Sequence, residues 1–474
     1  MKFFINLSKY QLYLLQLENY ELFRFWKLLF KKGFWPKKPQ RKELVWTAKA
    51  FSVFALAELL MLAAAALSFF VFMAQLGIRS SVLLGFAVFV VLKNLPFLGY
   101  SLAVALLLPL DFLLKQVLVF RARHKIKNLA SLKVIGIAGS YGKTTMKEVL
   151  LAVLSAKFKV AATPESVNTP VGIARWALKK LDPSVELLIV EMGEHYKGDV
   201  EEVCAIAQPD IAVVTGINEA HLERMKSLEN VVDTIFEIVS RSKPGALVVL
   251  NGDDRNVIQN YKKYVWPDHK VESFKAEDLS NRNFNTQTLR WETELAEIGK
   301  VKINLLGEYV LADVSAAVRL AKSLGMGSEE IKKGVEKIQP VEHRLEPIKS
   351  GGDVLVIDDA YNGNSTGVTE AIKVLSRFQN RRKIYITPGL VETGKAAEEV
   401  HKKIGGELAS VADLVILIKN SVTPFIAEGL KAAGCTPEKI VWFNTAAAAH
   451  ENLKNILKPG DVILFQNDWG DQYL

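Results

Sequence analysis

Cysteine is scarce in this chain, and so is repetition. The 474 residues include two cysteines, Cys204 and Cys435, which are too few for a disulfide framework and too far apart for a metal-ligand cluster. This usage fits a reducing compartment, with both thiols as ordinary core residues. No internal repeat or low-complexity segment is present, and at about 150 residues per domain the chain should form roughly three units.

Acidic side chains are scarce in the N-terminal part. Residues 1–133 contain 19 Lys and Arg but five Asp and Glu, whereas the remainder contains 41 and 46. Basic residues grouped around apolar segments are typical of contact with anionic lipid headgroups rather than of nucleic-acid binding. We therefore expect membrane lipids, and no nucleic acid, among the partners.

Charge is nearly absent from two long apolar runs. The first, Phe51–Leu76, has Glu58 as its one charged residue and exceeds the roughly 20 residues that span a bilayer core, so it predicts a transmembrane helix. The second, Val82–Leu114, predicts one kinked span, with a tight hairpin as the alternative. The residues that interrupt it are Lys93, Pro96 and Asp111. Basic residues flank the pair of runs and Arg79 alone lies between them, which places both flanks in the cytoplasm.

The segment before the first run mixes aromatic and basic residues. Side chains such as Tyr10, Phe23 and Trp35 alternate there with Lys and Arg, which suits a helix in the headgroup layer; packing on a soluble domain or a partner is the alternative. The first apolar run begins too far along the chain for a signal peptide. We predict an interfacial segment over 1–45 and two spans within 46–120, in a multi-pass plasma-membrane protein with cytoplasmic catalytic domains.

A glycine-rich loop follows a short β-rich run at residues 133–138. The loop reads Gly139-Ser140-Tyr141-Gly142-Lys143-Thr144-Thr145. Apolar residues at helical spacing come next, and strand, loop and helix in this order are the context of a phosphate-binding loop. Backbone N–H groups would hold the phosphates, Lys143 would reach the outer ones, and a Thr hydroxyl would ligate magnesium. Ile137 stands where the strict pattern has its first glycine.

Beyond the loop, β-rich and helical runs alternate. Short apolar strands between helices predict a parallel sheet that is covered on both faces and binds ligands at the carboxyl ends of its strands. Glu191, His221 and Asn251, the last with Asp253 and Asp254, end or follow such strands. Singly, Glu191 would be a helix-capping or solvated carboxylate and His221 an ordinary loop histidine. Together beside the loop, these groups favour metal and nucleotide contacts.

A second α/β region follows residue 341. Five β-rich segments separated by helical runs predict a doubly wound, Rossmann-like sheet; they read VLVID, KIYIT, LVILI, KIVWF and VILFQ. A polar stretch between 262 and 305 predicts an antiparallel insertion. The predicted fold class is therefore α/β after the transmembrane helices, with a P-loop ATPase domain over 128–340 and a C-terminal domain over 341–474.

The motifs together resemble the Mur ligase family, and within it the MurF branch, which adds D-alanyl-D-alanine to a cell-wall precursor. The resemblance covers about residues 133–474. The similar segments are Gly139–Thr145 (family pattern G-T-x-G-K-S/T-S/T), Asn168–Gly172 (N-N-x-x-G), Glu191–Gly193 (E-M/L-G) with Gly198–Val200 (G-E-I), Ala220–Glu223 (A-H-L-E/D), Asn251–Asp254 (N-x-D-D), His343–Glu346 (H-R-L/M-E) and Asp358–Asn364 (D-D-x-Y-N-A-N).

The resemblance implies ATP and Mg²⁺ as cofactors. It implies that the acceptor's carboxylate attacks the γ-phosphate of ATP and that an amine then attacks the acyl phosphate, which forms an amide. The catalytic residues would be Lys143, Glu191 and His221, and the metal ligands Thr144, Glu191 and His221. Asn251 would meet the adenine, and Arg344 and Asp359 the ribose and phosphates. The remaining nucleotide contacts would be Gly139, Ser140, Gly142, Lys143, Thr144 and Thr145.

The chain departs from the family at several places. Ile235 stands where the family has a carbamoylated lysine that supports a second metal ion. Residues 307–310 differ from the family's G-R-H-N, and residues 466–469 from its K-G-S-R. The apolar runs replace the domain that grips the UDP-sugar.

Three hypotheses follow. The first is an ATP-dependent Mur-type ligase that adds D-alanyl-D-alanine or an amino acid to a cell-wall peptide precursor, lipid-linked or otherwise held at the membrane. The second is a related ligase for another peptide or polymer, such as a polyglutamate. The third is a catalytically weakened nucleotide-binding scaffold in a membrane-bound wall-synthesis complex, which Ile235 favours.

Overall fold

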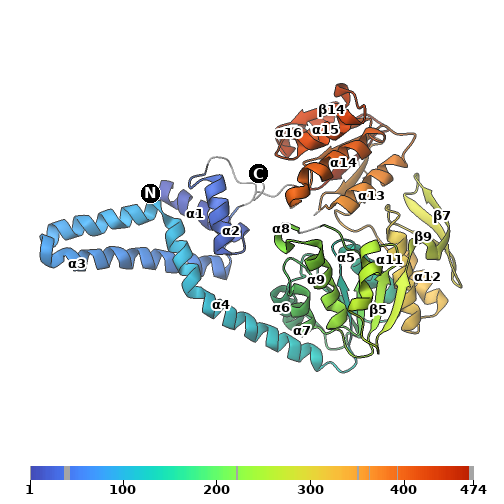
Figure 1. The fold of residues 1–474 in the computed structure, drawn as a ribbon, viewed down its shortest axis with the longest axis horizontal. Coiled ribbons are helices and arrows are strands. Elements are labelled where there is room, and N and C mark those ends of the chain that lie inside the picture. Colours follow the sequence, from blue (N-terminus) through green and yellow to red (C-terminus); the bar gives the residue numbers. More distant parts are fainter. Residues whose placement is uncertain are drawn as a thin grey trace. The chain divides into compact units, whose positions relative to one another are not determined.

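The computed structural model describes residues 2–36, 43–219, 222–349, 352–361, 363–391 and 393–468, and Figure 1 traces their fold. The chain divides into two compact units, with the boundary between Val117 and Leu118. Among the described residues, the first unit contains helices and the second contains all the strands.

Long apolar helices dominate the first unit. Its helices are α1 (Lys2–Leu17), α2 (Leu22–Lys32), α3 (Ala48–Asn94) and the first part of α4 (Pro96–Lys127). Helix α3 folds back on itself at Gly77, whose φ of 73° is not helical (Figure 1). In the part of the chain that the structure describes, three helical stretches are long and apolar enough to cross a membrane: Ala48–Met73, Gly77–Asn94 and Pro96–Lys127. That they do cross one stays a prediction.

Side-chain contacts define the direction of these helices. Glu58 lies on the first arm of α3, before Gly77, and forms an ion pair with Lys93 at the end of the second arm, after Gly77. Farther along the chain, the Asp111 carboxylate on α4 lies 2.9 Å from the Lys49 ammonium, near the start of the first arm. The second arm of α3 therefore runs opposite to the first arm, and the beginning of α4 continues in the direction of the second arm. The second apolar run is thus two consecutive helices, divided at Leu95 where Pro96 cannot donate a backbone hydrogen bond.

The N-terminal aromatic residues pack largely inside the first unit. Tyr10, Tyr13 and Phe25 belong to one apolar cluster with residues of α3 and α4, and the Tyr100 hydroxyl donates a hydrogen bond to the Ser8 carbonyl oxygen at 3.1 Å. These side chains therefore pack on the apolar helices α3 and α4 rather than on a soluble domain, and the placement of the segment in the headgroup layer stays a prediction. Other aromatics stay exposed, and they are Phe23, Phe30, Trp35 and Trp46.

A six-stranded parallel sheet forms the centre of the second unit, as predicted. Its order is β2 (Val160–Ala162), β3 (Leu187–Glu191), β1 (Lys133–Ala138), β4 (Ile211–Val214), β5 (Leu247–Asn251), β6 (Lys270–Phe274). Helices α5 (Lys143–Leu154), α11 (Val310–Ser323) and α12 (Ser328–Glu336) share one apolar cluster with it, and α6 (Pro170–Lys180), α7 (Asp199–Ile206) and α9 (Leu228–Ser240) another. Short helices α8 (Leu222–Met225) and α10 (Arg255–Asn260) complete this region.

A small antiparallel sheet is inserted after β6. It contains β7 (Leu279–Asn285), β8 (Arg290–Leu295) and β9 (Gly299–Ile303). The predicted insertion is therefore correct for these strands. It is wrong for β6, which continues the parallel sheet beside β5 because its buried Phe274 joins the sheet core.

The C-terminal sheet also has the predicted doubly wound form. Its order is β10 (Glu346–Lys349), β11 (Leu355–Asp359), β15 (Val462–Gln466), β12 (Lys383–Thr387), β13 (Leu414–Ile418), β14 (Ile440–Phe443). All neighbours are parallel except the edge strand β10, which pairs antiparallel with β11. The accompanying helices are α13 (Ser365–Ser376), α14 (Ala397–Ala409), α15 (Thr423–Ala432) and α16 (Ala446–Ile456).

Candidate active site

The glycine loop lies between β1 and α5, where the sequence places it. Gly139 has a φ of 152°, and a side chain there would collide with Thr215 at the end of β4. Gly142, with a φ of 78°, precedes the first residue of α5 and gives it no side-chain cap. The N–H groups of the first turn are therefore left for an external acceptor, and the helix dipole favours an anion there.

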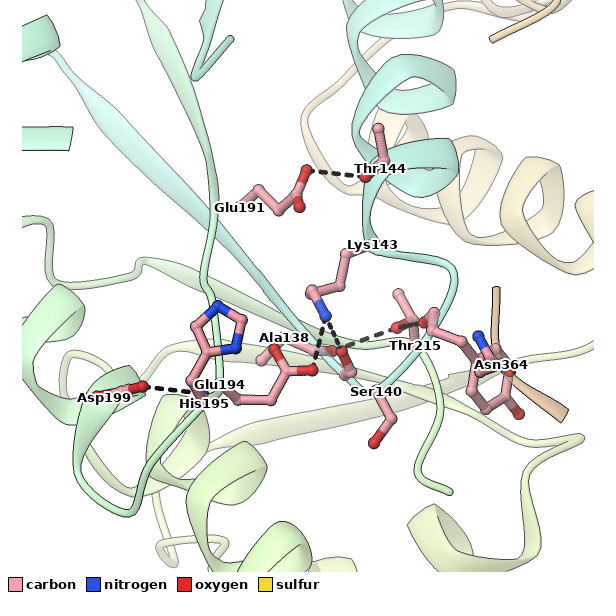
Figure 2. A network of polar contacts seen from close by, with 12 residues as sticks. Ala138, Ser140, Lys143, Thr144, Glu191, Glu194, His195, Asp199, Thr215 and Asn364 are labelled. Carbon is pink, nitrogen blue, oxygen red and sulfur yellow. Dashed lines mark hydrogen bonds and ion pairs between the residues drawn. The ribbon is translucent and has the colours of Figure 1, made fainter. Parts of the chain in front are cut away.

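Lys143 points along this loop, as Figure 2 shows. Its ammonium donates to the Gly139 carbonyl oxygen and lies 2.7 Å from a carboxylate oxygen of Glu194. Glu194 is 2% exposed, so this is a buried ion pair. The sequence analysis did not single out Glu194. Its position three residues after Glu191, just beyond the end of the same predicted strand, was the signal that could have identified it.

Thr144 and Glu191, which the resemblance assigns to magnesium, lie within hydrogen-bond distance of each other. Glu191 ends β3, and its carboxylate accepts a hydrogen bond from the Thr144 hydroxyl at 3.2 Å (Figure 2). The same carboxylate oxygen lies 3.5 Å from the ammonium of Lys147, a further residue that the sequence reasoning did not single out. The neighbouring strands β1 and β3 bring these groups together, because they pair in parallel with Ile137 beside Glu191.

The other predicted loop residues have local partners. The Ser140 hydroxyl donates to the Asn218 carbonyl oxygen at 3.4 Å. Thr145 is buried. Burial also raises the pKa of the phenol of Tyr309, which belongs to the segment that differs from the family's G-R-H-N.

Residues after β5 fix the loop from the other side. The Asn251 amide donates to the Thr215 carbonyl oxygen at 2.6 Å, and its oxygen accepts from the Asp253 N–H at 2.9 Å. Asp254 caps α10 by accepting from the Val257 N–H, and it accepts the Tyr141 hydroxyl at 2.6 Å. Asp254 is therefore a helix cap that also holds Tyr141, and the predicted contact of Asn251 with adenine stays a prediction.

Arg344 and Asp359 come together in the C-terminal domain. Arg344 donates to the Tyr361 carbonyl oxygen at 2.7 Å and stacks over that ring. Asp359 accepts from the Gln466 amide at 2.8 Å. Burial raises the pKa of Asp359, whereas its hydrogen bond to Gln466 and the charge of Arg344 lower it.

Polar contacts join this region to the P-loop domain. The Tyr361 hydroxyl lies 2.6 Å from the Ser166 hydroxyl. Asn218, which follows β4, donates to the Asn364 side-chain oxygen at 3.0 Å and to the Thr366 hydroxyl at the same distance. The carboxyl ends of both sheets therefore contribute to one site.

Two predictions about the metal meet different outcomes. His221 lies outside the described residues, so its role stays a prediction. Ile235 is fully buried in an apolar cluster with α6 and α7 and offers no oxygen ligand. Nearby Glu237 accepts hydrogen bonds from the Gly198 and Glu201 N–H groups at 3.0 and 2.9 Å, so it fixes the start of α7.

These features define a class: a P-loop enzyme whose nucleotide site lies between a parallel sheet and a second, doubly wound α/β domain. Residues 137–321 match the sequence profile of the Mur ligase middle domain, and residues 343–466 match that of the Mur ligase glutamate ligase domain. The chain belongs to the Mur ligase family, the ATP-dependent acid–amino-acid ligases.

Two relatives illustrate the similarity. The UDP-N-acetylmuramoyl-tripeptide–D-alanyl-D-alanine ligase of Bacillus subtilis is 26% identical over 343 residues, which cover 71% of this chain and 73% of the relative. The Escherichia coli enzyme of the same name is 28% identical over 323 residues, covering 65% and 70%.

Solved structures agree. MurF from Acinetobacter baumannii has a TM-score of 0.67 at 25% identity and covers 76% of this chain and 78% of its own. MurF from Thermotoga maritima, in complex with ADP, has a TM-score of 0.65 at 27% identity and covers 75% and 80%.

Proposed function

We propose that this chain is a membrane-anchored ligase that adds D-alanyl-D-alanine, or an amino acid, to the carboxylate of a cell-wall peptide precursor. The observation that carries the proposal is the convergence of Lys143, Thr144 and Glu191 at the uncapped start of α5. ATP would bind there, with its phosphates on the loop N–H groups and on Lys143.

The residues fit a magnesium ion. A hydroxyl and a buried carboxylate 3.2 Å apart are the hard oxygen donors that Mg²⁺ prefers. Thr144 and Glu191 would hold it, and when bound it would neutralise charge on the transferring phosphoryl group. His221 would serve a further cation, and Ile235 supplies none of the support that the family's carbamoylated lysine gives.

The reaction then follows from charge and position. A carboxylate oxygen of the acceptor attacks the γ-phosphorus while the bond to ADP breaks, which leaves an acyl phosphate. The amine nitrogen attacks the acyl carbon, inorganic phosphate leaves, and the amine releases its proton to solvent. Lys143 and the first turn of α5 hold the oxygens on which negative charge moves, and such fixed charges stabilise a phosphoryl-transfer transition state.

The first unit supports a location at the plasma membrane. Its apolar helices expose large side chains such as Leu83 and Phe86, and both basic flanks favour the cytoplasm for the ligase domains. A lipid-linked precursor would lie in the same membrane, so the apolar helices of the first unit would keep the enzyme close to its acceptor.

A related ligase with a different incoming amine is the second candidate. Asn467 stands in the region that differs from K-G-S-R. Its amide donates to the Gly389 carbonyl oxygen at 2.5 Å, and its oxygen accepts from the Gly363 N–H at 3.0 Å. These neutral contacts replace the cationic groups of the family pattern, which favours an altered amine pocket.

One experiment tests both. Full-length protein in lipid nanodiscs receives ATP, magnesium and either soluble UDP-linked tripeptide or its lipid-linked form, each with and without D-alanyl-D-alanine, and products are identified by mass spectrometry. We expect the dipeptide to be added to the lipid-linked acceptor. Equal use of the soluble acceptor would contradict the lipid-linked part, and addition of another amine alone would favour the second candidate.

A further inference from the structure

A second lysine lies behind the nucleotide loop, one turn after Lys143 on α5. Lys147 has no exposed surface, and among the described residues its ammonium has no hydrogen-bond partner. Burying a charged ammonium is costly unless another charge compensates it. Because the cost of burying this ammonium must be offset, we expect an opposite charge close to Lys147 within the site.

Two carboxylates lie at ion-pair distance from Lys147, each 3.5 Å away. The side chain of Glu148 is 39% exposed, whereas that of Glu191 is 6% exposed. Water screens the first pair, so the interaction with Glu191 is the stronger one. The carboxylate oxygen that faces Lys147 is also the one that accepts the Thr144 hydroxyl.

Around the first turn of α5, the described residues therefore include two buried ion pairs. Lys143 is paired with Glu194, and Lys147 with Glu191. Under the proposed function, the phosphates of ATP take Lys143 and the divalent cation takes Glu191. The cation can reach Glu191 only by competing with an ammonium that is already present.

We infer that Lys147 is a positioning residue that neutralises Glu191 in the metal-free site and competes with the divalent cation for it. This inference rests on the proposed function because it takes Glu191 as the metal ligand. Once a cation is bound, Lys147 adds a further positive charge, which the phosphates of a nucleotide offset. Lys147 thereby makes metal binding depend on nucleotide, so that the cation enters with ATP rather than alone.

Manganese binding tests the competition without any turnover. Full-length protein in detergent is titrated with Mn²⁺ and followed by electron paramagnetic resonance, with and without ADP. We expect Lys147→Met to bind Mn²⁺ roughly tenfold more tightly than wild type in the absence of nucleotide, because a like charge near the ligand is gone. The gain from ADP should shrink accordingly.

The matched control is Glu148→Gln, which removes the exposed partner of the same lysine and should leave Mn²⁺ affinity within about twofold of wild type. An unchanged or weaker affinity in Lys147→Met would overturn the inference. This test does not use a ligase assay. The Mn²⁺ affinities can therefore be interpreted even if the proposed substrate is wrong.

A thermal cycle covers the case in which Lys147→Met alone does not fold. In metal-free protein, Glu191→Gln should lower the melting temperature, because Lys147 is left as an unpaired buried charge. Adding Lys147→Met to Glu191→Gln should raise it again. If Glu191→Gln melts like wild type, or if the double variant melts no higher than Glu191→Gln, then Lys147 does not serve as the counter-charge of Glu191.

Discussion

The two units of this protein place apolar side chains in opposite ways. On the kinked α3, Leu67, Leu83 and Phe86 are each at least 64% exposed, whereas on α9 of the second unit Ile235 and Phe236 are fully buried. Contiguous apolar surface of this kind is unfavourable in water. The contrast supports the proposal that the first unit lies in a membrane and the second in water, in which case the same substitution should have different effects in the two units.

The largest expected effect is on the nucleotide site alone. Lys143→Ala should lower ATP turnover at least 100-fold, since it removes the cation that neutralises the phosphates. Phosphate release measures this turnover, and membrane-fraction recovery serves as the control that the first unit is unaffected. Turnover close to wild type would remove Lys143 from the chemistry, whereas measurable turnover abolished by the substitution would exclude the scaffold hypothesis.

A charge placed on each unit sharpens the contrast. Leu83→Lys introduces a lysine on the apolar face of α3, where about 2.5–3.5 kcal/mol opposes insertion at the centre of a membrane helix. Carbonate extraction should recover less of this variant in the membrane pellet. Ile258→Lys changes an exposed residue of the second unit and should leave recovery unchanged; equal recovery of the two variants would contradict a lipid-facing α3.

Glu194→Gln should have a moderate effect on nucleotide affinity. In the nucleotide-free site Glu194 holds Lys143, and its negative charge repels the phosphates. Its neutral replacement should bind ATP several-fold more tightly, as measured by displacement of a fluorescent nucleotide. Glu202→Gln, a change on α7, is the matched control; weaker binding in Glu194→Gln would instead mark Glu194 as a direct support of the loop.

The smallest effect concerns pH. The hydrogen bond that the His343 ring donates to the Asp358 carboxylate raises the pKa of His343. Protonated His343 therefore stabilises the folded state below its ordinary pKa of about 6.5, and this contribution is lost as pH rises through the raised value. Because the side chain is 45% exposed, the contribution is below about 1 kcal/mol. The melting-temperature difference between wild type and His343→Gln should shrink from pH 6 to pH 8, and a difference that grows would reverse this assignment.

Local patterns account for most of what the sequence predicts correctly. The loop and the strands of the two large sheets, apart from β6 and β10, were predictable because each is a short apolar run next to a helix or a glycine turn. Strand β10 was missed because Glu346–Lys349 contains a proline and two charged residues, and it exists only through its pairing with β11.

Partners distant in sequence could not be predicted. The role of Glu194 depends on its ion pair with Lys143, which lies 51 positions earlier and is brought close by the pairing of β1 with β3. The packing of Tyr10 and Tyr13 likewise depends on how α3 and α4 lie beside α1, which composition does not specify.

The isoleucine at position 235 also determines how the enzyme should respond to dissolved carbon dioxide. A lysine carbamate forms by reversible addition of carbon dioxide, so a site that relies on one responds to the bicarbonate supply. Here the position is an isoleucine sealed in an apolar cluster, and it cannot take up carbon dioxide. The catalytic rate of this enzyme should therefore be the same in bicarbonate-free and bicarbonate-rich buffer.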